Sequence, residues 1–272
     1  MSPRTFPSDS SVVAEVMPSP NHGERIDGRR PDMTVLHYTG MPDAAAALER
    51  LRTPASQVSA HYFVFEDGRV IQLVQESRRA WHAGTASWAG ETDINSCSIG
   101  IEIANPGHEY GYPDFPKRQI AAVTALCRGI LTRNTIPAVR VLAHSDVAPA
   151  RKQDPGEKFP WRTLHESGVG NWVRPAEITD GALLALGDHG DAVAAMQTSL
   201  SEYGYGIAVN GNYDSAMHEV VAAFQRHFRP ERVDGVSDAS TRSTLQDLLD
   251  HRGRPRTIAA RAITFKRLVI AS

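Results

Sequence analysis

Two histidines and one aspartate are spaced so that one metal ion could gather them. His37 ends the apolar run 33–37 and His144 follows the apolar run 139–143, so both imidazoles are expected at strand ends. Asp154 lies in the segment after His144, which its prolines and glycine predict to be an ordered loop. Two neutral imidazoles and a carboxylate form the ligand set of catalytic zinc sites, since three protein ligands leave the fourth tetrahedral position open. The spacing alone does not decide this, because a histidine before a loop is more often a hydrogen-bonded structural residue.

A structural zinc site is not expected, because such a site takes four ligands and is commonly rich in thiolates. The chain has two cysteines, Cys97 and Cys127, and they do not form a close pair. They allow at most one disulfide, which excludes a secreted disulfide scaffold.

The composition is that of an ordinary soluble protein, with 41% hydrophobic and 22% charged residues, and 272 residues suffice for two domains. A net charge of -2 provides no overall field for nucleic acid, so no nucleic-acid partner is expected. Residues 1–30 contain no apolar core of a signal peptide, and no transmembrane run occurs. A cytoplasmic location is therefore expected for the chain as encoded, with the cell envelope or periplasm as the alternative. The sequence predicts no oligomeric state.

The elements that must position the metal ligands alternate between strand and helix. After the strand at 33–37, the stretch 43–52 begins with aspartate and continues with good helix formers. The runs 61–65 and 70–74 flank an Asp-Gly turn and predict a hairpin. A strand at 98–104, an amphipathic helix over 120–131 and the strand at 139–143 follow. The pattern predicts an α/β domain with a mixed central sheet flanked by helices, over residues 31–175.

The strand at 98–104 carries a second chemical group. Three isoleucines point to one face, and the other face is nearly bare except for Glu102. This pattern is typical of a cleft floor with a catalytic carboxylate. Without further information, an ordinary carboxylate at the rim of a sheet is the more common interpretation.

The segments outside this domain have different sequence patterns. Residues 1–30 lack periodicity and are expected to form an irregular arm, and 174–181 is expected to be a linker. Residues 181–250 contain an internal repeat at a shift of 24, in which each copy has a Gly turn, an Asp cap and an amphipathic helix, so a small all-α three-helix domain is expected. The tail at 251–272 holds six Arg/Lys and no acidic residue, and a solvated end is a more common role for it than contact with an anionic polymer.

Several blocks, taken in order, resemble the type 2 N-acetylmuramoyl-L-alanine amidases, a family related to peptidoglycan recognition proteins. The resemblance covers roughly residues 33–161, and the segment 187–249 resembles a peptidoglycan-binding module. The matching blocks are Leu36-His-Tyr-Thr-Gly40, Ser59-Ala-His-Tyr62, Ala80-Trp-His-Ala-Gly84, Ser98-Ile-Gly-Ile-Glu-Ile-Ala-Asn105, Ala143-His-Ser-Asp-Val-Ala-Pro149 and Lys152-Gln-Asp-Pro-Gly156.

The resemblance implies roles for particular residues. His37, His144 and Asp154 would bind one Zn²⁺ per chain, and zinc makes water a nucleophile near neutral pH. Glu102 would act as the general base and acid, and Lys152 would stabilise the transition-state oxyanion.

Other residues have two interpretations. His82, Trp81 and Asn105 are expected along the substrate cleft, although Asn105 could instead hold its own turn. His61 and His82 are weaker candidates for metal ligands, and His61 is expected to be a packing residue. Trp81 and Trp88 could stack on sugar or frame the groove, or they could belong to the core.

The predicted function is zinc-dependent hydrolysis of the amide bond between N-acetylmuramic acid and L-alanine, in peptidoglycan or muropeptides. The helical module would hold the enzyme on its polymer. One alternative is a protein that recognises peptidoglycan without cutting it, and a weaker one is a zinc peptidase acting on another amide. The sequence does not distinguish anhydro-muropeptides from the intact sacculus as substrate.

Overall fold

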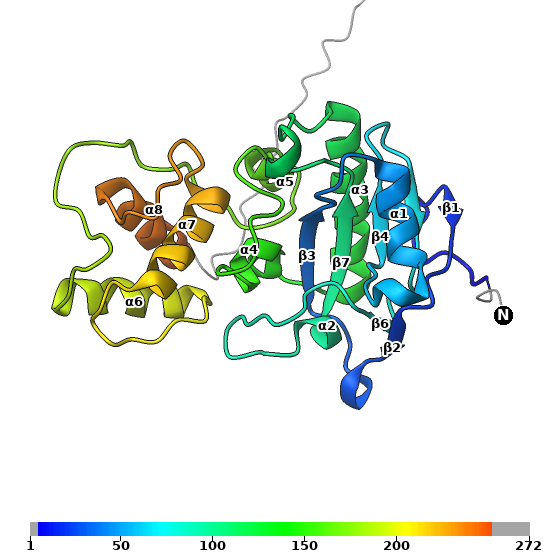
Figure 1. Ribbon diagram of the computed structural model, residues 1–272, viewed down its shortest axis with the longest axis horizontal. Coiled ribbons are helices and arrows are strands. Elements are labelled where there is room, and N and C mark those ends of the chain that lie inside the picture. The colour runs from blue at the N-terminus through cyan, green and yellow to red at the C-terminus, as the bar shows by residue number, and fades with distance from the viewer. Residues whose placement is uncertain (1–4, 252–272) are drawn as a thin grey trace, which may run out of the picture.

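The computed structural model describes residues 5–251, so the basic tail predicted at 251–272 lies, except for His251, outside the described residues. A six-stranded sheet in the order β1-β5-β4-β7-β3-β8 forms the core of the part of the molecule on the right in Figure 1, beside the helices α6 to α8 on the left. β7 pairs in parallel with both β3 and β4, and β4 pairs antiparallel with β5. The predicted mixed α/β sheet is therefore confirmed. The strands are β1 Glu15–Val16, β3 Met33–Tyr38, β4 Tyr62–Val64, β5 Val70–Gln72, β7 Ser98–Ile103 and β8 Val141–Ala143.

Two helices cover opposite faces of this sheet. α3 (Lys117–Asn134) packs its apolar stripe against the isoleucines of β7, all of which are fully buried. α1 (Ala44–Arg52) packs on the other face, against β4 and β5. Asp43 caps α1 by accepting a hydrogen bond from the N–H of Ala46, as its helix-start position predicts. In Figure 1 α1 lies in front of the sheet and α3 behind it.

The N-terminal arm is more ordered than its sequence predicts. β1 extends the main sheet, and β2 (His22–Glu24) pairs antiparallel with β6 (Arg78–Ala80). Arg25 is buried and donates to the backbone oxygens of Glu76 and Ser96. Strands of two or three residues are too short to show a periodic pattern, which is why the expectation of an irregular arm was wrong.

A short helix, α4 (His144–Val147), begins directly after β8, where the sequence predicted only an ordered loop. Four residues are too few for helical periodicity to be visible. The other short helices are α2 Ile94–Cys97, α5 Trp161–Glu166 and the 3₁₀ helices Ile26–Gly28, Pro54–Ser56, His108–Tyr110 and Ala138–Arg140.

The C-terminal part of the described chain contains three helices, as predicted, and we call residues 184–250 the helical unit. Asp214 and Asp238 cap its second and third helices through their side chains, which confirms the repeat at a shift of 24. In each copy the Gly turn before the cap is held by a buried glutamine, Gln197 or Gln225, whose side-chain oxygen accepts two N–H groups of the turn. The helices are α6 Asp191–Tyr203, α7 Ser215–Phe228 and α8 Ala239–Asp250.

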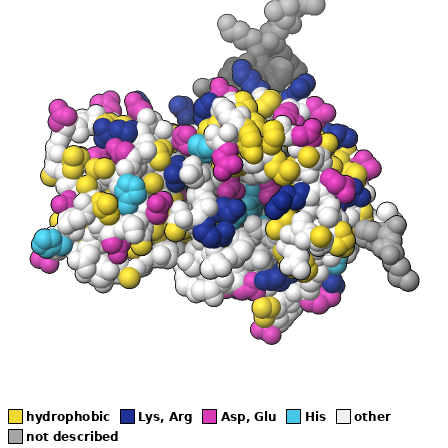
Figure 2. All heavy atoms as spheres, in the orientation of Figure 1, with side chains coloured by type: hydrophobic (Ala, Val, Ile, Leu, Met, Phe, Trp, Pro, Cys, Tyr) yellow, Lys and Arg dark blue, Asp and Glu magenta, His cyan; other side chains and the backbone are white. Residues whose placement is uncertain are grey.

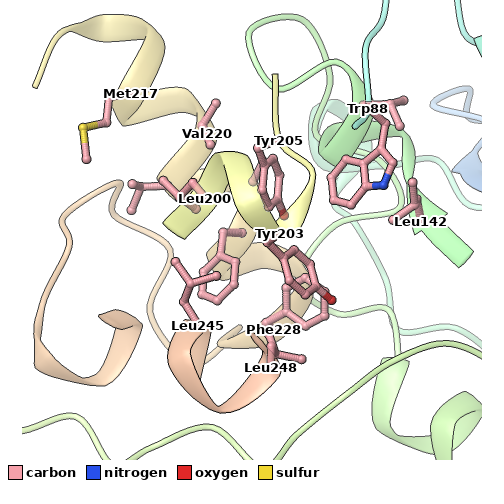
Figure 3. Packing of buried hydrophobic residues seen from close by; sticks show 14 of the residues in the cluster. Trp88, Leu142, Leu200, Tyr203, Tyr205, Met217, Val220, Phe228, Leu245 and Leu248 are labelled. Atoms are coloured by element: carbon pink, nitrogen blue, oxygen red, sulfur yellow. The ribbon is translucent and has the colours of Figure 1, made fainter. Parts of the chain in front are cut away.

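The helical unit shares a hydrophobic core with the sheet part of the chain. One continuous cluster joins Leu142 of β8 and Trp88 to Tyr203 and Tyr205 of the helical unit (Figure 3). Trp88 is 1% exposed, so the interpretation of this tryptophan as a core residue is the one that the structure supports. Within residues 5–251, no helix has the length and apolar character needed to span a membrane.

Candidate metal centre

His37, His144 and Asp154 lie together at one end of the sheet, on its α1 face. The Nδ1 atoms of the two histidines are 2.9 Å apart, and Oδ2 of Asp154 is 3.2 Å from the first and 3.0 Å from the second. Tetrahedral ligands with bonds of about 2.0 Å are separated by about 3.3 Å, so these three atoms fit around one zinc-sized ion. Among the described residues, this is the one group of three such side chains able to hold a metal ion.

The outer nitrogen of His144 fixes the tautomer of its ring. Nε2 lies 3.1 Å from the carbonyl oxygen of Ala83, which can only accept a hydrogen bond. The proton is therefore on Nε2, and the lone pair of Nδ1 faces the site. Outer partners of this kind commonly orient metal-binding histidines.

A chain of hydrogen bonds does the same for His37. The hydroxyl of Ser98 donates to the carbonyl of Ile94, so its oxygen accepts from Nε2 of His82 at 3.1 Å. Nδ1 of His82 is then an acceptor, and it receives the Nε2 proton of His37 at 3.0 Å. Nδ1 of His37 is left with a lone pair toward the site. Both histidines thus present an unprotonated nitrogen at the same point, as a metal requires.

The charge states agree with this arrangement. Burial, together with the nearby His144, lowers the pKa of His37 to about 4, so its ring is neutral near pH 7. At neutral pH the site therefore offers the neutral imidazole of His37, beside the ring of His144 and the side chain of Asp154.

Glu102 lies beside these ligands on β7. Its backbone is in register with His37 on the parallel strand β3, so both side chains project from the same face of the sheet. Oε2 of Glu102 is buried and has no hydrogen-bond partner among the described residues. Burial and the charge of Asp154 raise the pKa of Glu102 to about 8, against the opposing effect of Lys152. A carboxyl group in this state can exchange a proton near neutral pH.

The site forms the floor of an open cleft of about 560 Å³. In Figure 2 histidine and acidic side chains appear at the bottom of a hollow that basic side chains surround. Lys152 lines this cleft together with Glu102 and the three candidate ligands, so the structure brings these five predicted residues together. Trp81 and His82 also line it, with Trp81 partly exposed.

Two other candidate site residues, Asn105 and His61, hold the fold together. Asn105 is 3% exposed and uses its amide to hold the loop, donating to the oxygen of Pro113 and accepting from the N–H of Gly107. The structure thus supports its turn role and not the predicted substrate contact. His61 is buried against Arg25 and accepts a hydrogen bond from the N–H of Gly100, so it is a packing residue and not a metal ligand.

Sequence reasoning missed part of the cleft wall. Tyr38 hydrogen-bonds through its hydroxyl to His108 at 3.0 Å, and His108 pairs with Glu157 at 3.1 Å. Arg50 and Arg151 add positive charge to the lining. The position of Tyr38 directly after His37 was a usable signal, whereas the two arginines become neighbours of the site only through the fold.

Comparison with known proteins gives two family matches. The sequence pattern of the N-acetylmuramoyl-L-alanine amidases matches residues 27–157, and that of a peptidoglycan binding domain matches residues 189–245. The chain is 36% identical to N-acetylmuramoyl-L-alanine amidase AmiD of Escherichia coli K12, over 81% of this chain and 83% of that protein. It is 33% identical to 1,6-anhydro-N-acetylmuramyl-L-alanine amidase AmpD of Citrobacter freundii, over 56% of this chain and 90% of that protein.

Solved structures agree over most of the chain. AmiD from E. coli, in complex with the substrate anhydro-N-acetylmuramic acid-L-Ala-D-gamma-Glu-L-Lys, superposes with a TM-score of 0.72 and 34% identity, covering 84% of this chain and 91% of that chain. AmpDh3 from Pseudomonas aeruginosa gives a TM-score of 0.69 at 33% identity, covering 84% and 94%. Both likenesses extend well beyond the 131 residues of the amidase pattern.

Proposed function

The chain belongs to the N-acetylmuramoyl-L-alanine amidases, and from this premise we propose that His37, His144 and Asp154 bind one zinc ion and that Glu102 and Lys152 carry the hydrolysis. The bond cut joins the lactyl group of N-acetylmuramic acid to L-alanine. The single observation that supports this best is the pair of histidine tautomers, since Ala83 and His82 leave both Nδ1 lone pairs pointing to one place. A structural cluster has no need of two unprotonated nitrogens and a carboxylate oxygen in contact.

When bound, zinc supplies a Lewis acid that makes water a nucleophile near neutral pH. Glu102 is placed to take the proton from the attacking water, because it lines the cleft beside the ligands and its buried Oε2 has no hydrogen-bond partner among the described residues. The same carboxyl group then delivers this proton to the nitrogen of L-alanine as the amide bond breaks. A pKa raised toward neutrality suits both tasks.

Lys152 stabilises the negative charge that develops on the carbonyl oxygen of the substrate in the transition state. Its ammonium group lines the cleft, and its charge is felt by both Glu102 and His37. No hydrogen bond or ion pair of this ammonium occurs within residues 5–251, so it remains available to the substrate. A cation aimed at a developing charge is commonly worth about 3 kcal/mol in the transition state.

The substrate class follows from the shape and charge of the cleft. Arg50, Arg151 and Lys152 line an open groove, which suits a stem peptide with several carboxylates. Trp81 offers a partly exposed aromatic face for sugar or lactyl contact. We therefore expect muropeptides to be cut, with the helical unit, through its peptidoglycan-binding pattern, retaining the enzyme on larger fragments.

The alternative of recognition without cleavage has less support, because binding alone requires neither the paired lone pairs nor the unpartnered Glu102. A purified muropeptide distinguishes the two. The zinc-loaded protein should release free stem peptide, detected by mass spectrometry, and Glu102→Gln should bind zinc and muropeptide but release almost none. Binding of muropeptide with no cleavage by the zinc-loaded wild type would favour recognition.

A further inference from the structure

Asp146 is a buried carboxylate that joins the two halves of the molecule. It is 0% exposed, and Oδ2 accepts the N–H of Ala143 at 2.8 Å. Its other two donors come from the helical unit. The hydroxyl of Tyr205 donates to Oδ1 at 2.7 Å, and Nδ1 of His227 donates to Oδ2 at 2.6 Å, from 59 and 81 residues away in sequence. Two of the three hydrogen bonds to this side chain of the sheet part therefore come from the helical unit.

This carboxylate lies on the segment that carries the metal ligands. α4 begins at His144, and its first turn is capped by Asp146 through Ala143. Within the same turn, the N–H of Ser145 donates to the carbonyl of Asp154 at 3.0 Å, which ties α4 to the third ligand. A shift of α4 would therefore move the His144 ring and alter the support of Asp154. The backbone positions of His144 and Asp154 therefore depend on how firmly Asp146 is held.

The helical unit is docked against this segment with close packing. The ring of Tyr205 lies edge-on to Trp88 with centroids 4.9 Å apart (Figure 3). The backbone N–H of Ala89 donates to the carbonyl of Gly204. A Cβ on Gly204 would lie 2.5 Å from the Trp88 ring, so only glycine permits this approach. On the other side, His227 stacks on Trp161 at 3.7 Å. Such contacts specify one docked position.

We propose that Asp146 is a positioning residue of the metal site, and that Tyr205 and His227 make the helical unit a structural part of that site. The proposal rests on the proposed function for the role of the metal, although its geometry does not. Tyr205 and His227 do not line the cleft, so they would act on the chemistry only through Asp146 and α4. The helical unit would then contribute to turnover of small substrates that never reach its own surface.

The opposing view is that these bonds only stabilise the interface. The chain offers a matched pair that separates the two ideas. Tyr205 and Tyr213 are 2% and 1% exposed, and each phenol donates one 2.7 Å hydrogen bond. The acceptor of Tyr205 is Asp146, whereas the acceptor of Tyr213 is the carbonyl of Gly235 inside the helical unit. Tyr205→Phe and Tyr213→Phe thus each remove one buried phenol hydrogen bond, the first at the contact between the two parts and the second inside the helical unit.

Three measurements on the full chain decide between the views. The first is cobalt affinity of chelator-treated protein, followed by visible absorption. The second is hydrogen exchange of the peptide covering 141–147 in the metal-free protein. The third is kcat and KM on a soluble muropeptide. We expect Tyr205→Phe to weaken cobalt binding about 5- to 10-fold, to speed exchange at 141–147 and to lower kcat with KM unchanged. Tyr213→Phe should lower the melting temperature similarly and leave the three other readouts at wild-type values.

Equal behaviour of the two variants in cobalt affinity and exchange would overturn the proposal. A second test uses Asp146 itself. Asn at this position can still accept from Ala143 and His227 and can donate to the Tyr205 oxygen, so Asp146→Asn should retain most of the cobalt affinity, and Asp146→Ala should lose about tenfold more. If the wild type binds cobalt but cuts no muropeptide, the proposed function fails, while the affinity and exchange readouts still test the role of Asp146.

Discussion

Glu102 on β7 and His37 on β3 are register partners in adjacent parallel strands, and this pairing sets the proposed catalytic carboxyl group beside a proposed metal ligand. Both strands are buried and form the centre of the sheet, so neither side chain depends on a loop for its position. Rigid elements hold reacting groups more accurately than loops do. In our proposal the two residues have separate tasks: Nδ1 of His37 contacts Nδ1 of His144 in the metal cluster, while Oε2 of Glu102 has no hydrogen-bond partner among the described residues.

Glu102→Gln should therefore lose catalysis and keep the metal. The amide is close in shape to the carboxyl group but cannot take a proton from water, so kcat on a muropeptide should fall by about 10²- to 10⁴-fold. Zinc content, measured by atomic absorption after dialysis, should stay at one per chain. If this variant retains the wild-type rate, Glu102 is not the base.

The raised pKa of Glu102 also predicts a pH dependence of stability in the metal-free protein. Because the folded protein holds this proton up to about pH 8, whereas an unfolded glutamate loses it near its ordinary value, the folded state binds more protons in between. Stability should thus fall as pH rises toward 8. His37 and His61, with pKa values lowered by burial to about 4 and about 3, act oppositely, but only below their ordinary pKa of 6.5.

Between about pH 6.5 and 8, the titration of Glu102 therefore affects stability without opposing changes from these histidines. Denaturant unfolding of chelator-treated wild type should show falling stability across it, and Glu102→Gln should be flat, since the glutamine does not titrate. The difference between the two proteins removes the histidine contributions. Parallel curves for both proteins would show that Glu102 carries no raised pKa.

Lys152→Met tests charge stabilisation apart from metal binding. The apolar replacement keeps the length of the side chain and removes the cation from the cleft, so kcat should fall by about 10²- to 10³-fold with zinc content unchanged. Lys117, exposed at the start of α3, is the matched control, and Lys117→Met should have wild-type kinetics. A change in KM alone for Lys152→Met would assign this lysine to substrate binding.

His82 was predicted along the substrate cleft, and its hydrogen bonds give it a second task, the orientation of His37. His82→Phe keeps a ring of similar size but breaks the chain from Ser98, so metal affinity should fall by about 10- to 100-fold. KM for a muropeptide should change little once metal is saturating. A raised KM with normal metal affinity would instead restore the substrate-contact interpretation.

Gly100→Ala tests the packing of the His82 ring against β7. A Cβ at Gly100 would lie 2.4 Å from Cγ of His82, so the ring must move or the strand must bend, at a cost of about 1–3 kcal/mol in unfolding free energy. At Gly23 on β2 the nearest atom to a new Cβ is 4.0 Å away. Gly23→Ala should therefore leave the unfolding free energy, measured for both variants by urea titration, nearly unchanged. Equal effects at the two positions would contradict the packing described here.

The local pattern of apolar and polar residues was sufficient to predict the strands that carry His37 and Glu102 and the strand that precedes His144. The apolar runs before His37 and His144 predicted strand ends, and the alternation around Glu102 predicted the face on which it lies. The resemblance to the amidases then supplied the roles, which spacing alone left open. The bare face at Gly100 was interpreted as a cleft floor, yet it is partly the seat of the His82 ring, because only the folded chain shows which side chain covers a glycine.

Long-range contacts explain the remaining differences. Nothing near Asp146 in sequence indicates that Tyr205 and His227 will donate to its carboxylate, so the core that the sheet part shares with the helical unit could not be predicted from local pattern. For Asn105 the sequence left both a substrate contact and a turn role open, and in the structure its amide is used by its own turn.

The most direct test of the central claim is cleavage of a muropeptide of defined structure by chelator-treated protein, before and after one equivalent of zinc, with the products identified by mass spectrometry. We predict no free stem peptide without metal and full release once zinc is restored. His144→Ala should show no such restoration, since it lacks one of the three ligand atoms. Undiminished release of stem peptide by the metal-free wild type would contradict the account.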